Sequence, residues 1–114
     1  MEQPFMYLVG YNKDFQKNCN SGWGCGYVAI PKGHLIEVWY SMQDKDGFDY
    51  LQLSEFGEEI TLTNYGKIGD KEYLTIGFDT AHSYNSPELN NYEYVFNATK
   101  KILDIINNFH KRIK

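Results

Sequence analysis

The C-terminal stretch from Asn90 to Lys114, NNYEYVFNATKKILDIINNFHKRIK, decides the fold class of this chain. Apolar side chains recur along it at steps of three and four residues, which is the spacing of one face of an α-helix. Asn90 and Glu93 form a capping-box-like start, and Lys111 complements the helix dipole near the end. We therefore predict an amphipathic helix from about Asn91 to Lys111. Its apolar stripe consists of Tyr92, Val95, Phe96, Thr99, Ile102, Leu103, Ile106, Phe109 and Ile113.

The apolar stripe of this helix needs a sheet to cover, and the preceding segments have the composition of strands. The strongest strand prediction is Tyr73–Asp79, and Phe5–Tyr11 is either a short strand or an entry loop. A run of strands followed by a helix predicts a single α+β domain over residues 1–114, with an antiparallel or mixed small β-sheet covered by the helix. The other predicted strands are Tyr27–Ile30, Leu35–Tyr40, Tyr50–Phe56 and Glu59–Leu62. The predicted loops and turns are Asn12–Gly26, Asp44–Gly47 and Asn64–Asp70.

The charge and aromatic content restrict the class of ligand. The 114 residues carry a formal net charge of −4 with mixed signs along the chain, so binding to a nucleic-acid polymer is not expected. A small anion held by backbone N–H groups is compatible with this charge. Tyr, Phe and Trp make up 17% of the chain, and some of these rings must therefore face solvent or a ligand.

The N-terminal residues and the cysteines bear on location and cofactors. No basic segment precedes an apolar run, and no stretch approaches the ~20 apolar residues that span a bilayer. We therefore expect a cytoplasmic protein without membrane contact, in which Cys19 and Cys25 are free thiols. Their spacing matches no common zinc module, and together with His34 they still lack a fourth ligand. Neither a metal nor another cofactor is expected.

Polar side chains follow two of the predicted strands. His34 comes after the turn P31-K-G33, and Asp79, Thr80 and His82 come at the end of the strongest strand. An enzymatic hypothesis uses His34 and His82 as an acid/base pair, with Asp79 orienting one imidazole. The structural alternative is that each histidine fixes a loop and that Asp79 and Thr80 cap a turn. No nucleophile, P-loop, zinc or dinucleotide-binding motif accompanies these residues.

A binding hypothesis accounts for these residues together with the Gly-rich segment around Trp23. Glycines let backbone N–H groups approach a phosphate, aromatic rings stack on a base, and His, Thr or Lys side chains donate hydrogen bonds. Trp23 stands between two glycines in a polar segment, which is an unusual place for a purely structural ring. We therefore favour a ligand-binding protein over a complete enzyme.

Three motifs carry a resemblance to a known group of proteins. GYVAIPKGH at 26–34, the pair Ile60 and Thr61, and IGFDTAH at 76–82 occur in this order before the helix. The chain resembles a widespread family of short phage and prophage proteins with the pattern G-Y-V-x-V-P-x-G-H-P, V-H-G-G-L-T and G-F-D-x-A-H-x-G-D. It departs from the pattern where His-Gly-Gly is replaced near Glu59, and where Gly-Asp is replaced by Tyr84 and Asn85.

The resemblance implies a function. The family is similar to viral proteins that sequester cyclic-nucleotide or related nucleotide signals of host defence, known as nucleotide sponges. For this chain it implies a homodimer that captures a small nucleotide-derived signal without turnover. The alternatives are a small hydrolase or phosphodiesterase using His34, His82 and Asp79, or an inhibitor that binds a host protein. The ligand-binding residues implied by the motifs, with Trp23 added as a stacking ring, are Trp23, Tyr27, His34, Thr61, Asp79, Thr80 and His82.

Overall fold

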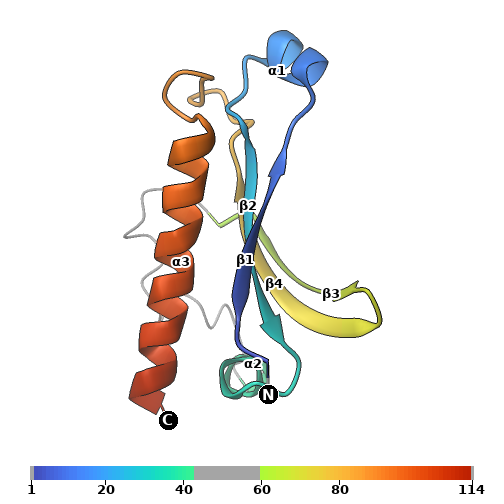
Figure 1. Cartoon of the computed structure of the whole chain (residues 1–114), viewed down its shortest axis with the longest axis vertical. Coiled ribbons are helices and arrows are strands. Elements are labelled where there is room, and N and C mark those ends of the chain that lie inside the picture. The colour runs from blue at the N-terminus through green and yellow to red at the C-terminus, as the bar shows by residue number, and fades with distance from the viewer. Residues whose placement is uncertain (1, 43–59, 114) are drawn as a thin grey trace.

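The computed structural model describes residues 2–42 and 60–113. Its elements follow in the order β1, α1, β2, α2, β3, β4 and α3 (Figure 1). Their bounds are β1 Phe5–Gly10, α1 Lys13–Cys19, β2 Gly24–Pro31, α2 Leu35–Ser41, β3 Leu62–Ile68, β4 Lys71–Asp79 and α3 Tyr92–Ile113. No helix in these two ranges is long and apolar enough to cross a membrane.

The four strands form one sheet in the order β1-β2-β4-β3, and every neighbouring pair is antiparallel. Helix α3 runs along one face of this sheet, and the β3–β4 hairpin curves away from the helix (Figure 1). The predicted fold class, an α+β domain with a sheet covered by a long C-terminal helix, is confirmed.

Helix α3 supplies four of the ten residues of the hydrophobic core. Its buried residues meet the even-numbered side chains of β2 and β4 on one face of the sheet. At Gly26 the helix comes so close that an added Cβ would lie 1.9 Å from Oγ1 of Thr99. The helix starts one residue later than the predicted cap, because Oδ1 of Asn91, not Asn90, accepts the Tyr94 N–H at 3.0 Å. The core consists of Val28, Ile30, Ile36, Leu74, Ile76, Phe78, Val95, Ala98, Ile102 and Ile106.

Two predictions in the N-terminal half are wrong. The segment predicted as a loop, Asn12–Gly26, contains α1 and the start of β2, because Asn12 caps the helix through Phe15 N–H and Asn20 ends it at a φ of 49°. The segment predicted as a strand, Leu35–Tyr40, is helix α2.

Local capping explains why α2 overrides the strand propensity of Leu35–Tyr40. Nδ1 of His34 accepts the Ile36 N–H at 3.2 Å, and Oε1 of Glu37 accepts the Gly33 N–H at 2.9 Å. The arrangement is close to a capping box with histidine as the cap, except that Glu37 accepts the N–H of Gly33, the residue before the cap, and not that of His34. It satisfies N–H groups that a helix start would otherwise leave unpaired.

A third prediction, the loop Asn64–Asp70, is also wrong, because most of it belongs to β3. Ile68 pairs with Lys71, so only two residues connect β3 to β4, and the first, Gly69, has a φ of 67°. A glycine at that position suits a two-residue hairpin turn. The strand Tyr73–Asp79 is confirmed within β4, and Phe5–Tyr11 is largely the strand β1.

Several sequence predictions fall partly or wholly outside the part of the chain that the structure describes. Asp44–Gly47 and Tyr50–Phe56 lie outside it, as does the first residue of Glu59–Leu62. Ile60 and Thr61 precede β3, and the Thr61 N–H donates to the Gly77 carbonyl at 2.9 Å. Thr61 is therefore held beside β4.

Candidate functional site

One face of the sheet is turned away from α3, and we call it the open face. Even-numbered residues of β2 point toward the helix, as Gly26 against Thr99 demonstrates, so odd-numbered residues point away from it. The strand register extends this assignment across the sheet, with Tyr7, Tyr27, Gly77 and Leu62 in one row. The described residues of the open face are Phe5, Tyr7, Val9, Cys25, Tyr27, Ala29, Leu62, Asn64, Tyr73, Thr75, Gly77 and Asp79.

Aromatic rings form the floor of the open face. Tyr7 and Tyr27 are stacked, with ring centroids 5.0 Å apart and an angle of 26° between the planes. The Tyr27 ring extends over Gly77, where an added Cβ would lie 2.3 Å from Cδ1 of Tyr27. Phe5 continues the cluster and meets the ring of Tyr73 edge-on at 5.4 Å. Any side chain at position 77 would therefore displace the Tyr27 ring from this floor.

The open face is concave. Tyr7 of β1 and residues of β3, including Leu62 and Lys67, line one hollow of about 170 Å³ together with Thr75. These two strands are the opposite edges of the sheet, so the sheet must curl for them to share a hollow. The curvature of the β3–β4 hairpin in Figure 1 has the same direction.

A polar cluster occupies one end of the open face, where β4 ends. Oδ2 of Asp79 accepts a hydrogen bond from the Thr61 hydroxyl at 3.1 Å, and Oδ1 accepts from the Ala81 N–H at 3.1 Å. Nε2 of His82 lies 3.2 Å from Oδ1 of Asp79. The structure thus brings together three of the residues selected from the sequence, Thr61, Asp79 and His82.

The imidazole of His82 lies beside an acidic side chain, but its Nε2 atom forms no hydrogen bond with any described residue. Its Nε2 atom is buried, and the approach to Asp79 has the distance of an ion pair but not the geometry of a hydrogen bond. No other described residue binds Nε2. The ring stacks on Tyr84 at 5.0 Å and 7° between planes.

Two tyrosine hydroxyls converge near Asp79 around the thiol of Cys25. Cys25 pairs with Asp79 in the strand register, and its Sγ lies 3.3 Å from the Tyr11 hydroxyl. Burial, reinforced by Cys25 and by the charge of Asp79, raises the pKa of both Tyr11 and Tyr27 far above the ordinary 10.0. Both phenols therefore remain protonated hydrogen-bond donors at neutral pH.

Thr80 has a structural role in the sheet. Its side chain is fully buried, its Oγ1 donates to the Gly24 carbonyl at 2.7 Å, and the Gly24 N–H donates back at 3.2 Å. The Thr80 carbonyl also accepts the Gly22 N–H at 2.7 Å. The hydroxyl thus continues the β2–β4 ladder beyond the last backbone pair, and both of its hydrogen-bonding roles are used inside the fold.

Trp23 does not join the polar cluster. It meets Tyr92 of α3 edge-on at 5.0 Å, and with Phe96 and Leu103 it lines a groove of about 600 Å³ between β1 and α3. Trp23 therefore lies on the helix side of the sheet. The sequence prediction that it stacks on the same ligand as Asp79 has no geometric support.

His34 lies at the opposite end of the sheet from His82. It follows β2 and His82 follows β4, and these strands are antiparallel, so the length of β2 separates the two histidines, roughly 25 Å. His34 is 3% exposed, caps α2 through Nδ1, and contacts the ring of His110 at 4.5 Å. The acid/base pair of His34 and His82 is therefore wrong. Burial and the neighbouring His110 lower the pKa of His34.

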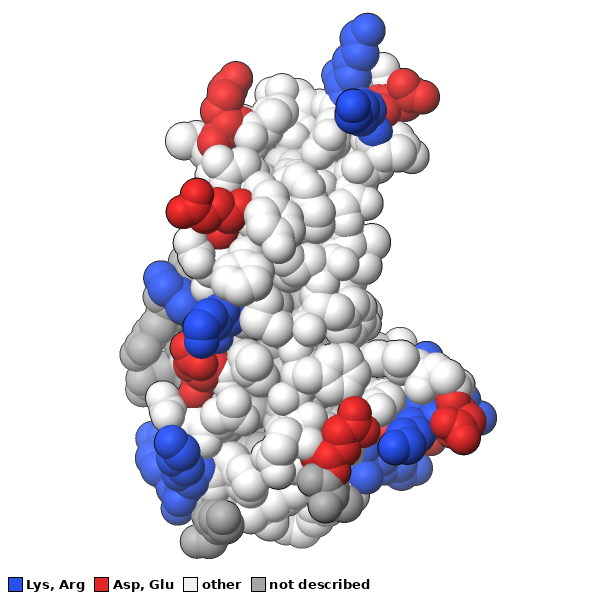
Figure 2. All heavy atoms as spheres, viewed as in Figure 1, with Lys and Arg blue, Asp and Glu red and all other residues white. Residues whose placement is uncertain are grey.

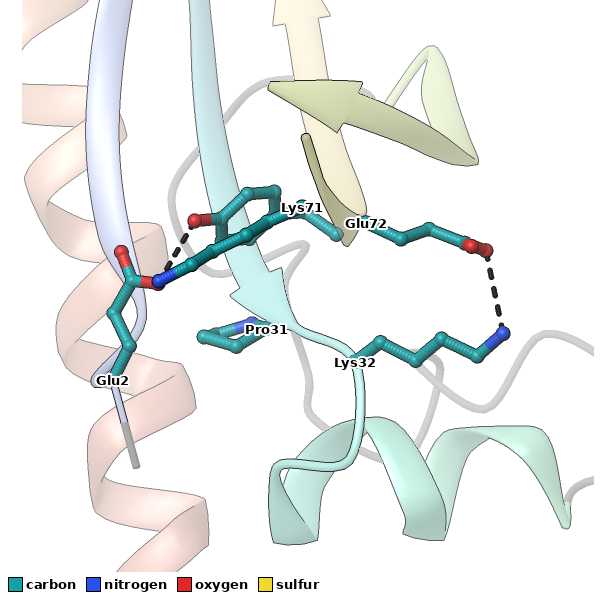
Figure 3. A pocket seen from close by; sticks show the side chains of 6 residues that line it. Glu2, Pro31, Lys32, Lys71 and Glu72 are labelled. Carbon is teal, nitrogen blue, oxygen red and sulfur yellow. Dashed lines mark hydrogen bonds and ion pairs between the residues drawn. The ribbon is translucent and has the colours of Figure 1, made fainter. Parts of the chain in front are cut away.

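A second hollow, of about 380 Å³, lies near the end of the sheet where β2 finishes (Figure 3). Its charged side chains point toward one another: Lys32 pairs with Glu72 at 3.6 Å, and Lys71 pairs with Glu2 at 3.9 Å. Glu2 also accepts the hydroxyl of Tyr73 at 2.8 Å. These charges compensate one another, so this hollow is a weaker candidate than the polar end of the open face.

Neither a cluster of metal-ligating side chains among the described residues nor a similar known protein helps to define the site. Within residues 2–42 and 60–113, no group of three or more His, Cys, Asp or Glu side chains is placed to hold a metal ion. Cys19 and Cys25 are both free, the first exposed and the second buried. No family model, no curated protein and no solved structure matches the chain.

Sequence reasoning missed Tyr7 and Cys25 of the open face, and Tyr11 and Tyr84 beside its polar cluster. Tyr7 and Tyr27 become neighbours only through the β1–β2 register, which local sequence does not specify. The alternation of Phe5, Tyr7 and Val9 was the available signal, because a strand places alternate residues on one face.

Proposed function

We propose that this chain is a binding protein that captures a small nucleotide-derived ligand, such as a cyclic-nucleotide signal of host defence, in the cytoplasm and without turnover. The observation that carries the proposal is a concave aromatic face with a polar cluster at its end. Tyr7 and Tyr27 offer a stacking surface for a base, which is worth about 1–3 kcal/mol per stacked base.

The chemistry of the two ends of the open face orients such a ligand. Asp79 accepts hydrogen bonds, so it suits the donors of a nucleoside, which are ribose hydroxyls and exocyclic amines. Phosphate groups are repelled by this carboxylate, so they would lie at the end of the open face away from Asp79. The base would lie over the tyrosine rings between these ends.

Isothermal titration tests the proposal with a panel of cyclic dinucleotides, cyclic trinucleotides and ADP-ribose derivatives. We expect at least one member to bind, and Tyr27→Leu to weaken its affinity by about 5- to 150-fold, the equivalent of one stacked base. Tyr92→Leu is the matched control, because Tyr92 is an exposed ring on the helix side of the sheet. No binding across the panel, or equal losses in both variants, would refute the proposal.

Turnover separates capture from the hydrolase alternative. After incubation, the protein is heat-denatured and the released ligand is analysed by chromatography. Recovery of the intact ligand is expected, because the distance between His34 and His82 removes the acid/base pair on which the hydrolase hypothesis relied. New products that disappear in His82→Ala would contradict capture without turnover and would assign chemistry to the Asp79–His82 contact.

A further inference from the structure

Strand β1 is an edge of the sheet without the usual protection. Its sequence FMYLVG contains no charged residue and no proline, whereas natural edge strands are commonly blunted by one or the other. The opposite edge, β3, carries Lys67 together with a glycine and an asparagine. The two edges of the sheet therefore differ, and β1 is the one suited to pairing.

The register shows which backbone groups of β1 are free. Tyr11 lies opposite Trp23 in the continued register, and its N–H donates to the Trp23 carbonyl at 2.9 Å. Hydrogen-bonded pairs alternate along an antiparallel ladder, so Phe5, Tyr7 and Val9 also direct their backbone groups toward β2. The N–H and C=O groups of Met6, Leu8 and Gly10 therefore point outward. No described residue pairs with them.

The side chains beside this edge are apolar on the helix side. Met6 and Leu8 line the groove of about 600 Å³ whose other walls include Trp23 and Phe96. The one charged side chain in the groove, Lys100, lies 3.5 Å from its own Asp104. In Figure 2, which looks onto the side where β1 lies in front, the surface along the strand is largely free of charged residues.

The absence of charged residues along the β1 edge indicates which kind of partner can pair with it. The chain carries a net charge of −4, so the repulsion between two copies is smallest where they meet at a surface without charged residues. The β1 edge is such a surface, and a two-fold axis places identical groups opposite one another. A charged peptide or an acidic partner would find no complementary charge on the strand.

We propose that two copies of the chain pair antiparallel through β1, with Leu8 of one copy opposite Leu8 of the second copy. This register places Met6 opposite Gly10, so all the outward-pointing N–H and C=O groups of both strands form hydrogen bonds. A shift by two residues would leave some of them unpaired. The two sheets become one, and this inference does not depend on the proposed function.

A cross-linking experiment tests the register. In a Cys19→Ser background, which removes the exposed thiol, Leu8→Cys is compared with Met6→Cys. Hydrogen-bonded antiparallel pairs have Cα atoms about 5.5 Å apart, within the range of a disulfide. Mild oxidation should give a covalent dimer for Leu8→Cys and little for Met6→Cys, whose thiol faces Gly10. Equal cross-linking of both variants, or none of either, would overturn the register.

Sedimentation equilibrium tests the association itself. The unmodified protein should have twice the 13.3 kDa mass of the chain. Leu8→Pro should return it to 13.3 kDa with an unchanged circular dichroism spectrum, because proline is tolerated where a strand N–H faces outward. A wild-type monomer at all concentrations refutes the proposal, as does a folded Leu8→Pro dimer. If Leu8→Pro unfolds, the cross-linking result decides.

Discussion

Replacing Thr80 with valine distinguishes a structural role from the ligand-binding role predicted from the sequence. Valine keeps the shape of the buried side chain but removes the hydroxyl that both donates to and accepts from Gly24. The Gly24 N–H and C=O are then buried without those partners, and each unsatisfied group costs about 1–3 kcal/mol. We expect the free energy of unfolding to fall by about 2–6 kcal/mol.

Urea denaturation followed by circular dichroism measures this loss, and a thermal melt should show the midpoint lowered by roughly 8–24 °C. Thr80→Ser is the matched control, because serine retains the hydroxyl and loses only a methyl group, at a cost of about 1 kcal/mol. A Thr80→Val variant within 0.5 kcal/mol of wild type (about one-half of a typical hydrogen bond) would show that the contact with Gly24 does not stabilise the fold.

Two further predictions concern the core and pH. Gly26→Ala should lower the free energy of unfolding by at least about 1–3 kcal/mol, because its Cβ would overlap Oγ1 of Thr99. Adding Thr99→Ala should recover part of this loss in a double-mutant cycle followed by urea denaturation, and strict additivity would contradict the overlap. Because the pKa of His34 is lowered in the folded state, the unfolded chain protonates this residue first, so the fold loses stability as pH falls through 6.5 toward the lower folded pKa. His34→Asn, which retains a capping side chain, should therefore lose less stability than wild type between pH 7 and 5.5, and equal losses would contradict the assignment.

The candidate site was predictable only in part. Asp79 and His82 are three residues apart at the end of a strongly predicted strand, so local sequence was sufficient to place them together. The resemblance selected Thr61 only as a ligand-binding residue, and its contact with Asp79 across 18 positions follows from its position beside β4. That these residues bind a ligand stays a prediction.

Thr80 and His34, which were predicted to bind the ligand, do not belong to the polar cluster, and the physical reason differs between them. Thr80 has its hydroxyl committed to the β2–β4 ladder, because a buried polar group must find partners inside the protein. His34 follows β2 and therefore lies at the far end from His82, since antiparallel neighbours finish at opposite ends. The sequence order of the motifs contained neither fact.

By itself, the sequence determined the long helix and the strand Tyr73–Asp79, because the spacing of apolar residues reports directly on which face is buried. The helix Leu35–Ser41 follows from local capping contacts that the strand pattern concealed, and the tertiary structure alone decided that Leu62–Ile68 forms an edge of the sheet. Short segments have weak intrinsic preferences, so capping contacts and pairing with neighbours determine their conformation. The aromatic open face arises in the same way, because rings from separate strands meet only once the register is set.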